Sequence, residues 1–215
     1  VHETTVAYKM MMANMSTPTA MILSRQNIKD LPAKECRLCE AHGAEKGAYV
    51  VSADENPQVV LLASGSEVST LAEAAELLRA EGVRLSIVSV PSEGLFRSQS
   101  AEYQQSVLPC GVKRFGLTAG LPVNLMGLVG ENGKIFGLES FGFSAPYTVL
   151  DEKLGFTPAK VAAEMKGVHE VTMAAVYSDL IDNKLFLLAS VVLSFPMYIV
   201  MVLFMNPISK YATDR

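Results

Sequence analysis

The fold is restricted most strongly by a strand, a helix and a second strand that follow one another between Gln58 and Val90. Gln58–Ala63 and Leu85–Val90 are short apolar runs, which are typical of buried strands. Between them, apolar residues recur at helical spacing: Val68, Leu71, Ala75 and Leu78. Ser64 and Glu67 have the spacing of a capping box, and Gly82 stands where a helix C-terminal glycine belongs. This βαβ order predicts a sheet that is at least partly parallel.

The same alternation continues toward residue 167. The pattern predicts strands over residues 114–119 and 134–139, and helices over residues 92–99, 101–108, 122–128, 147–154 and 158–166. Residues 47–167 are therefore expected to form an α/β domain: a three-layer sandwich with a mostly parallel mixed sheet of about five strands. An apolar helical tail is expected to follow it.

Residues 1–46 precede this domain and have a different character. Residues 1–27 read as the terminal helix and strand of a truncated domain, because one helix and the short strand Thr19–Leu23 cannot bury both of their faces. Residues 28–46 are rich in charged residues, proline and glycine and are expected to form a solvated linker.

The tail, residues 168–215, contains an uncharged run over residues 185–205, LFLLASVVLSFPMYIVMVLFM. About 20 apolar residues in a helix cross the hydrocarbon core of a bilayer, so this run predicts a transmembrane helix. Pro196 is tolerable within such a span. A helix buried against protein is the alternative. Lys184, Lys210 and Arg215 weakly favour a cytosolic C-terminus.

Charge and cysteine content exclude several classes of protein. With 18 basic and 22 acidic residues the net charge is −4, which gives nucleic acid no electrostatic attraction. Only 19% of residues are charged, which argues against a disordered chain. Three cysteines do not suit a disulfide scaffold, so residues 1–167 are expected in the reducing cytoplasm.

Two motifs resemble parts of metal-binding or phosphate-binding sites, and each also has a simpler structural interpretation. Cys36-x-x-Cys39 followed by His42 resembles part of a zinc or redox site, but no second close pair supplies the remaining ligands, so unpaired linker thiols are favoured. Gly130–Lys134 ends in Gly-Lys without the spacing of a phosphate-binding loop, and its Asn-Gly dipeptide favours a hairpin turn.

Two other features have catalytic or binding potential. Ser64-Gly65-Ser66 could cradle an anion at a helix N-terminus, but a cap with a tight turn is favoured. Glu139, at the end of an expected strand, is a candidate acid or base, with a capping or interface carboxylate as the plainer interpretation. No histidine lies between Gly43 and Val168, so the domain cannot hold an internal Ser-His-Asp triad.

A set of short segments resembles the C-terminal third of transketolase over about residues 1–167. In order along the chain they are residues 18–27 (PTAMILSRQN), 46–49 (KGAY), 60–68 (VLLASGSEV), 88–92 (VSVPS), Leu95-Phe96 with Gln99, Glu102-Tyr103, 106–109 (SVLP) and 141–146 (FGFSAP). No single segment is diagnostic, but together in register they are specific. The resemblance implies that residues 1–27 end a pyrimidine-binding domain and that residues 47–167 form the C-terminal domain.

The resemblance also implies a function and a site residue. Intact transketolases use thiamine diphosphate and Mg²⁺ to transfer a two-carbon ketol unit between phosphosugars in the pentose phosphate pathway, as homodimers. The motifs that hold this cofactor are absent here, so the chain is expected to bind none alone and to be inactive without the remaining domains. Arg25 matches the family's arginine that holds the substrate phosphate, a role that a planar guanidinium suits. The alternative is a non-catalytic binding or scaffold module, which residues 185–205 could tether to a membrane.

Overall fold

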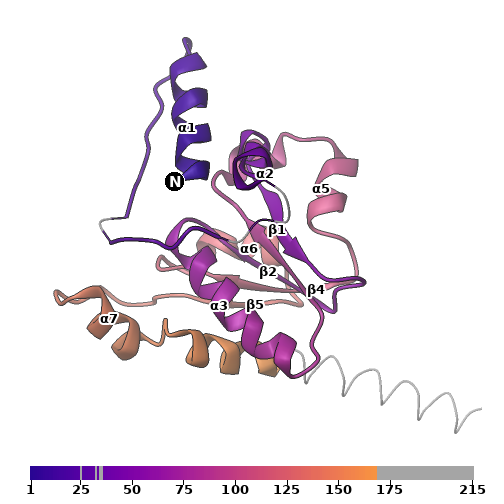
Figure 1. The fold of residues 1–215 in the computed structure, drawn as a ribbon, viewed down its shortest axis with the longest axis vertical. Coiled ribbons are helices and arrows are strands. Elements are labelled where there is room, and N and C mark those ends of the chain that lie inside the picture. The colour runs from indigo at the N-terminus through magenta and orange to yellow at the C-terminus, as the bar shows by residue number, and fades with distance from the viewer. Residues whose placement is uncertain (25, 32, 34–35, 169–215) are drawn as a thin grey trace, which may run out of the picture. The chain divides into compact units, whose positions relative to one another are not determined.

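A five-stranded mixed sheet lies at the centre of the described part of the chain (Figure 1). The computed structural model describes residues 1–168, except residues 25, 32 and 34–35. The strands are β1 (Tyr49–Ala53), β2 (Val59–Ala63), β3 (Leu85–Ser89), β4 (Lys113–Leu117) and β5 (Lys134–Phe136). Their order across the sheet is β1-β3-β2-β4-β5. All neighbouring strands pair in parallel except β1, which pairs with β3 antiparallel at one edge. The expected mostly parallel mixed sheet is therefore confirmed.

Two apolar cores cover the two faces of the sheet, as the three-layer prediction requires. Along β2, Leu61 belongs to one core, whereas its neighbours Val60 and Leu62 belong to the other. This alternation follows from the strand period of two, and because both faces are covered, β2 is apolar at every position. Helix α3 (Ser66–Ala80) and the helical residues 158–168 cover the first face. Helices α4 (Glu93–Arg97), α5 (Ala101–Val107) and α6 (Val123–Val129) cover the second.

The two ends of α3 differ in how well the sequence predicts them. At the C-terminus, Gly82 has φ +86°, its N–H donates to the Arg79 carbonyl, and the N–H of Val83 donates to the Leu78 carbonyl. These are the paired bonds of a Schellman motif, so the predicted terminal glycine is confirmed. At the N-terminus the capping box is wrong: Gly65 is the cap residue, with φ 62°, and no side-chain capping hydrogen bond is present. A glycine in this conformation turns the chain without a side-chain cap.

The turn at Gly130–Gly133 also differs from the prediction. It joins α6 to β5, and β5 pairs with β4 in parallel rather than as a hairpin partner. The Gly133 N–H donates to the Gly130 carbonyl, and Gly130 has φ +77°. An Asn-Gly dipeptide marks a sharp reversal, but a local signal does not specify whether a strand or a helix precedes it.

After β5 the chain reaches helix α7 (Tyr147–Leu154), which ends at Gly155 with φ +87°. A further helix begins at residue 158. Its Val161 and Met165 are buried in the core that also holds α3. Both predicted closing helices are therefore confirmed as far as the structure describes them.

Residues 1–46 contain more helix and less strand than the sequence predicts. Helix α1 (His2–Ala13) is present, but residues 19–23 form no strand, and Ile22 is 97% exposed. An apolar run becomes a strand only when another strand satisfies its backbone groups. The expected linker is partly helical, with α2 (Arg37–Ala41) followed by the 3₁₀ helix η1 (His42–Lys46).

The tail prediction, including residues 185–205, lies outside the described residues. Among the helices that the structure does describe, none combines the length and the apolar character that crossing a membrane requires.

Candidate functional site: the α1 docking region and the Arg25 segment

Arg25, the predicted phosphate-binding residue, lies outside the described residues. The described residues on either side of it form an extended arm between α1 and α2 (Figure 1). Leu23 and Ile28 on this arm are exposed, and Ile22 is almost fully so. The arm begins where α1 ends, so the contacts that fix α1 on the domain also fix the start of the arm.

Helix α1 is fixed by both apolar and polar contacts, and its Met10 packs on the same core as Val6. Val6 is 1% exposed and belongs to the core that covers the α3 face of the sheet. The hydroxyl of Ser89, at the end of β3, donates to the Glu3 carboxylate at 2.6 Å. Lys9 pairs with Glu45 of η1 at 2.8 Å. The helix is therefore docked on the domain at several points along its length.

The polar contacts under α1 continue into a cluster that includes α2 and β1. The Arg37 guanidinium donates to the Tyr49 hydroxyl at 2.9 Å and pairs with Glu40 at 3.0 Å. Burial raises the pKa of Tyr49, the Glu3 carboxylate raises it further, and Arg37 opposes both. Tyr49 therefore stays neutral near pH 7 and links α1, α2 and β1 by hydrogen bonds rather than by proton transfer.

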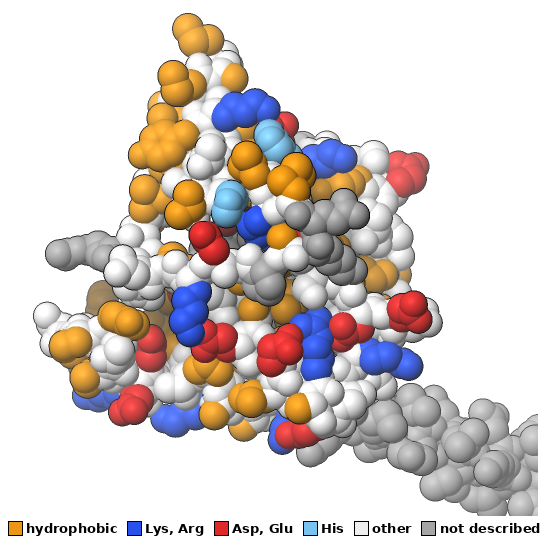
Figure 2. All heavy atoms as spheres, in the orientation of Figure 1, with side chains coloured by type: hydrophobic (Ala, Val, Ile, Leu, Met, Phe, Trp, Pro, Cys, Tyr) orange, Lys and Arg blue, Asp and Glu red, His pale blue; other side chains and the backbone are white. Residues whose placement is uncertain are grey.

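The opposite side of α1, together with Met15 just beyond the helix C-terminus, carries exposed apolar residues. Tyr8, Met12 and Met15 are 47%, 77% and 92% exposed. Figure 2 shows hydrophobic side chains gathered along this helix. A helix that is docked on one side and apolar on the other presents a surface suited to a further protein partner.

The Ser64–Ser66 turn lies where the strand order changes direction, between β2 and β4. Ligands of open α/β sheets bind at such a point. Here, however, the Ser66 hydroxyl donates to the carboxylate of Glu67 at 3.0 Å. Burial raises the pKa of Glu67, the Ser66 hydrogen bond opposes the rise, and Asp151 of α7 adds to it. A carboxylate beside the turn repels an anion, so a tight turn in which Gly65, not a serine, is the cap residue is the better interpretation.

The other candidates from the sequence, Glu139 and the Cys36–Cys39 pair, do not belong to a cluster of catalytic or metal-binding side chains among the described residues. Glu139 is exposed and lies beyond the end of β5. Cys36 and Cys39 are joined as a disulfide, which corrects the expectation of unpaired thiols. Within the part of the chain that the structure describes, no three His, Cys, Asp or Glu side chains gather as a set of metal ligands.

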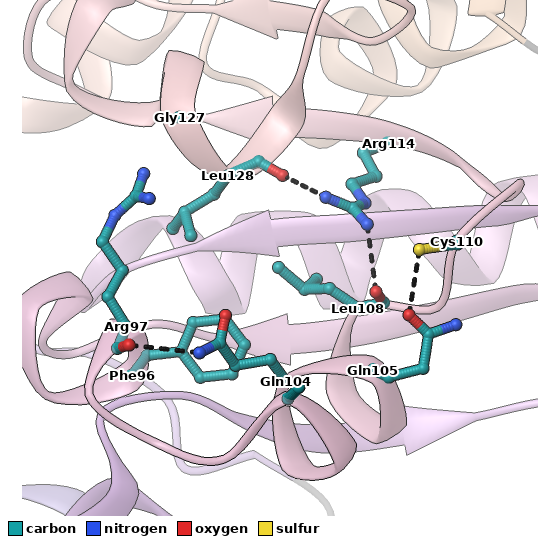
Figure 3. A pocket seen from close by; sticks show the side chains of 10 residues that line it. Phe96, Arg97, Gln104, Gln105, Leu108, Cys110, Arg114, Gly127 and Leu128 are labelled. Atoms are coloured by element: carbon teal, nitrogen blue, oxygen red, sulfur yellow. Dashed lines mark hydrogen bonds between the residues drawn. The ribbon is translucent and has the colours of Figure 1, made fainter.

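A cavity of about 250 Å³ opens between α4, α5, α6 and β4 (Figure 3). The Arg114 guanidinium borders it and donates to the carbonyls of Leu128 at 2.7 Å and Leu108 at 3.0 Å. These carbonyls lie at the C-terminal ends of α6 and α5, where a cation is favourable, so Arg114 has a structural role. A Cβ at Gly127 would meet the Arg97 guanidinium, the far end of a flexible side chain that is 52% exposed and can move aside.

The docking contacts of α1 were not predictable from the sequence. Glu3 and Ser89 are 86 positions apart, and neither belongs to a motif. Together, the fold and this region define a class of protein: a three-layer α/β domain that carries a helix and an extended arm on its N-terminal side.

Comparison with known proteins identifies the family. A family model described as the transketolase-like C-terminal domain matches residues 47–157. The chain belongs to this family. Transketolase from Staphylococcus aureus (strain MW2) is 41% identical over 162 residues, and the one from Halalkalibacterium halodurans is 39% identical over 171 residues.

Solved transketolases have the same fold over most of the chain. Transketolase from Leishmania mexicana has a TM-score of 0.70 at 34% identity, covering 79% of this chain and 24% of that one. A transketolase from Pichia stipitis in complex with sedoheptulose 7-phosphate has a TM-score of 0.70 at 30% identity, covering 80% and 24%.

The matches cover most of this chain but only part of each relative. The S. aureus match takes in 74% of this chain and 24% of that transketolase, and the H. halodurans match takes in 79% and 25%. The chain thus spans about a quarter of the length of these curated relatives. The fold predicted from the resemblance is confirmed.

Proposed function

We propose that this chain is the C-terminal portion of a transketolase, which transfers a two-carbon ketol unit between phosphosugars once the remaining domains are supplied. The observation that carries the proposal is the family match over residues 47–157, extended by relatives that cover 74–79% of the chain. The P. stipitis transketolase of the same fold is described in complexes with xylulose 5-phosphate and sedoheptulose 7-phosphate, which supports phosphosugars as the substrate class.

The cofactor belongs, in this proposal, to the domains that the chain does not span. Thiamine diphosphate needs a divalent metal to hold its diphosphate, and the described residues offer no cluster of ligands for one. Because the family's cofactor-binding motifs are absent from this sequence, we propose that the chain alone binds neither thiamine diphosphate nor Mg²⁺. When bound in the other domains, the cofactor supplies the carbanion chemistry of ketol transfer.

In this proposal the chain contributes a substrate-binding residue and a packing surface to the intact enzyme. Arg25 holds the phosphate of the sugar through two parallel charge-assisted hydrogen bonds, which fix the distance between the phosphate and the reacting carbon. The exposed side of α1, with Tyr8 and Met12, and the nearby Met15 pack against the domain that precedes them in the relatives. The assembled enzyme is proposed to be a cytoplasmic homodimer.

Two assays on the purified chain test the proposal. With xylulose 5-phosphate, ribose 5-phosphate, thiamine diphosphate and Mg²⁺, the isolated chain should show no turnover. Used as bait, it should capture the two cofactor-binding domains of a transketolase. Turnover by the chain alone would contradict the need for the other domains. Failure to bind them, with capture of an unrelated protein, would favour the non-catalytic scaffold instead.

A further inference from the structure

Cys36 and Cys39 form a pair of sulfur atoms that ketol transfer does not use. The two residues are joined as a disulfide with their Cα atoms 5.2 Å apart, within the usual range for a bridge. Both residues are exposed to solvent. An exposed pair three positions apart can be reached by small reagents and can close on itself without movement of the rest of the domain.

The pair begins the helix on which α1 docks. Cys36 is the cap residue of α2, and its sulfur accepts from the Cys39 N–H at 3.3 Å. The next residue, Arg37, has a side chain that is 10% exposed and ties α2 to Tyr49 of β1. Helix α1 packs on α2 and on η1. A bond that restrains the first turn of α2 therefore also restrains part of the docking surface of α1.

We propose that Cys36 and Cys39 are a redox-active dithiol–disulfide site that exchanges with low-molecular-weight thiols and disulfides, and that its disulfide form holds α2 in the position where α1 docks. The site uses residues of this chain alone. It therefore acts whether or not the chain takes part in ketol transfer.

With glutathione as the partner, the atoms and electrons of the thiol–disulfide exchange balance. In the oxidising direction, a thiolate of the reduced pair attacks glutathione disulfide, forms a mixed disulfide and releases one glutathione thiolate. The second cysteine thiolate then attacks the mixed disulfide at the protein sulfur, closes the Cys36–Cys39 bond and expels the second glutathione thiolate. Two thiols of the protein are oxidised, one glutathione disulfide is reduced to two thiols, and the two protons pass to these thiolates.

The first experiment follows the redox state of the full chain in glutathione buffers of graded ratio. Cys110, which is exposed and free, is replaced in all samples as Cys110→Ser to remove the third thiol. Trapping with an alkylating reagent and intact mass should show one two-electron transition, with no lasting glutathione adduct. Cys36→Ser and Cys39→Ser should each hold one stable adduct, and a serine at position 36 can still cap α2. A pair that stays reduced in excess glutathione disulfide, or that takes up two glutathiones, would overturn the proposal.

The second experiment measures the effect on α1 docking by hydrogen–deuterium exchange. On reduction, amides of α2 should exchange about 10-fold faster, because the bridge no longer restrains the first turn. Amides of α1 should also exchange faster, whereas those of α3, which does not carry the bridge, should be unchanged. Equal exchange of α1 in the two redox states would overturn the link between the bridge and docking.

Discussion

Glu3 and Ser89 show, at the scale of single residues, how α1 is held on the domain. Ser89 is 1% exposed, and its hydroxyl donates to a carboxylate that stands 86 positions earlier in the chain. A hydrogen bond to a charged group contributes about 1.5–3 kcal/mol. Such a pair explains why a short helix with few buried residues keeps a defined position.

Arg25 is the residue on which the proposed substrate binding depends. In an enzyme completed with the missing domains, Arg25→Ala should lower kcat/KM for phosphosugars about 10- to 150-fold, because a charge-assisted phosphate contact of about 1.5–3 kcal/mol is lost. Acceptors without a phosphate should be much less affected, since they offer nothing for Arg25 to hold. Steady-state kinetics with both kinds of acceptor measure this. Equal losses for the two would contradict a phosphate-binding role.

Glu67 makes the stability of the domain depend on pH. Because burial raises the pKa of Glu67, the folded state binds the proton more tightly than the unfolded chain does. This contribution to the free energy of unfolding is complete below the ordinary glutamate pKa and is lost as the pH rises through the raised value. We therefore expect Glu67→Gln to be more stable than the wild type at about pH 7 and to have no advantage at about pH 3.

Urea unfolding at the two pH values measures this difference. Glu131→Gln, at an exposed position, is the matched control and should change the free energy of unfolding little at either pH. A gain for Glu67→Gln that is equal at both pH values would show that the buried charge is not the cause.

At the scale of the element, Gly47 ends η1 at a point where the chain approaches α4 closely. Gly47 and Gly82 share φ +86°, but only Gly47 is crowded: a Cβ there would overlap backbone atoms of Ser92, Leu95 and Phe96. Gly82→Ala should cost about 1–2 kcal/mol for the left-handed backbone. Gly47→Ala should cost about 1–3 kcal/mol more for overpacking. Thermal or urea unfolding of the two variants compares them, and equal costs would contradict the close approach.

The membrane prediction for the tail, residues 168–215, can be tested by truncating the chain. Val168 is buried, so a truncation should follow His169 rather than precede it. From the uncharged run over residues 185–205, we expect the full chain to partition into detergent or membrane and the 1–169 form to stay in the aqueous phase. Phase separation of the two forms measures this. A full chain that remains monomeric in buffer without detergent would contradict the membrane prediction.

Elements with a strong local signal were predictable from the sequence, and those that depend on distant partners were not. The apolar runs at β2 and β3 and the glycine after α3 follow from local chemistry, and the structure has all three. The run at residues 19–23 is also largely apolar but has no strand beside it among the described residues. The Ser64 cap failed because the left-handed Gly65 takes the cap position itself. The Glu3–Ser89 contact depends on tertiary packing, which periodicity does not encode.

At the scale of the whole molecule, the described residues form a complete α/β domain with an arm. Two cores, one on each face of the sheet, give the domain its stability. The arm and the exposed side of α1 carry apolar side chains that are not covered within the described residues.

The most direct test of this account is the activity of a chimera. Residues 1–169 replace the homologous quarter of the S. aureus transketolase, and turnover of xylulose 5-phosphate with ribose 5-phosphate is measured against the same enzyme without that quarter. The account predicts that the chimera is active and the truncated enzyme is not. A chimera that folds and binds thiamine diphosphate, yet shows no ketol transfer, would contradict the proposal that this chain is the working C-terminal portion of a transketolase.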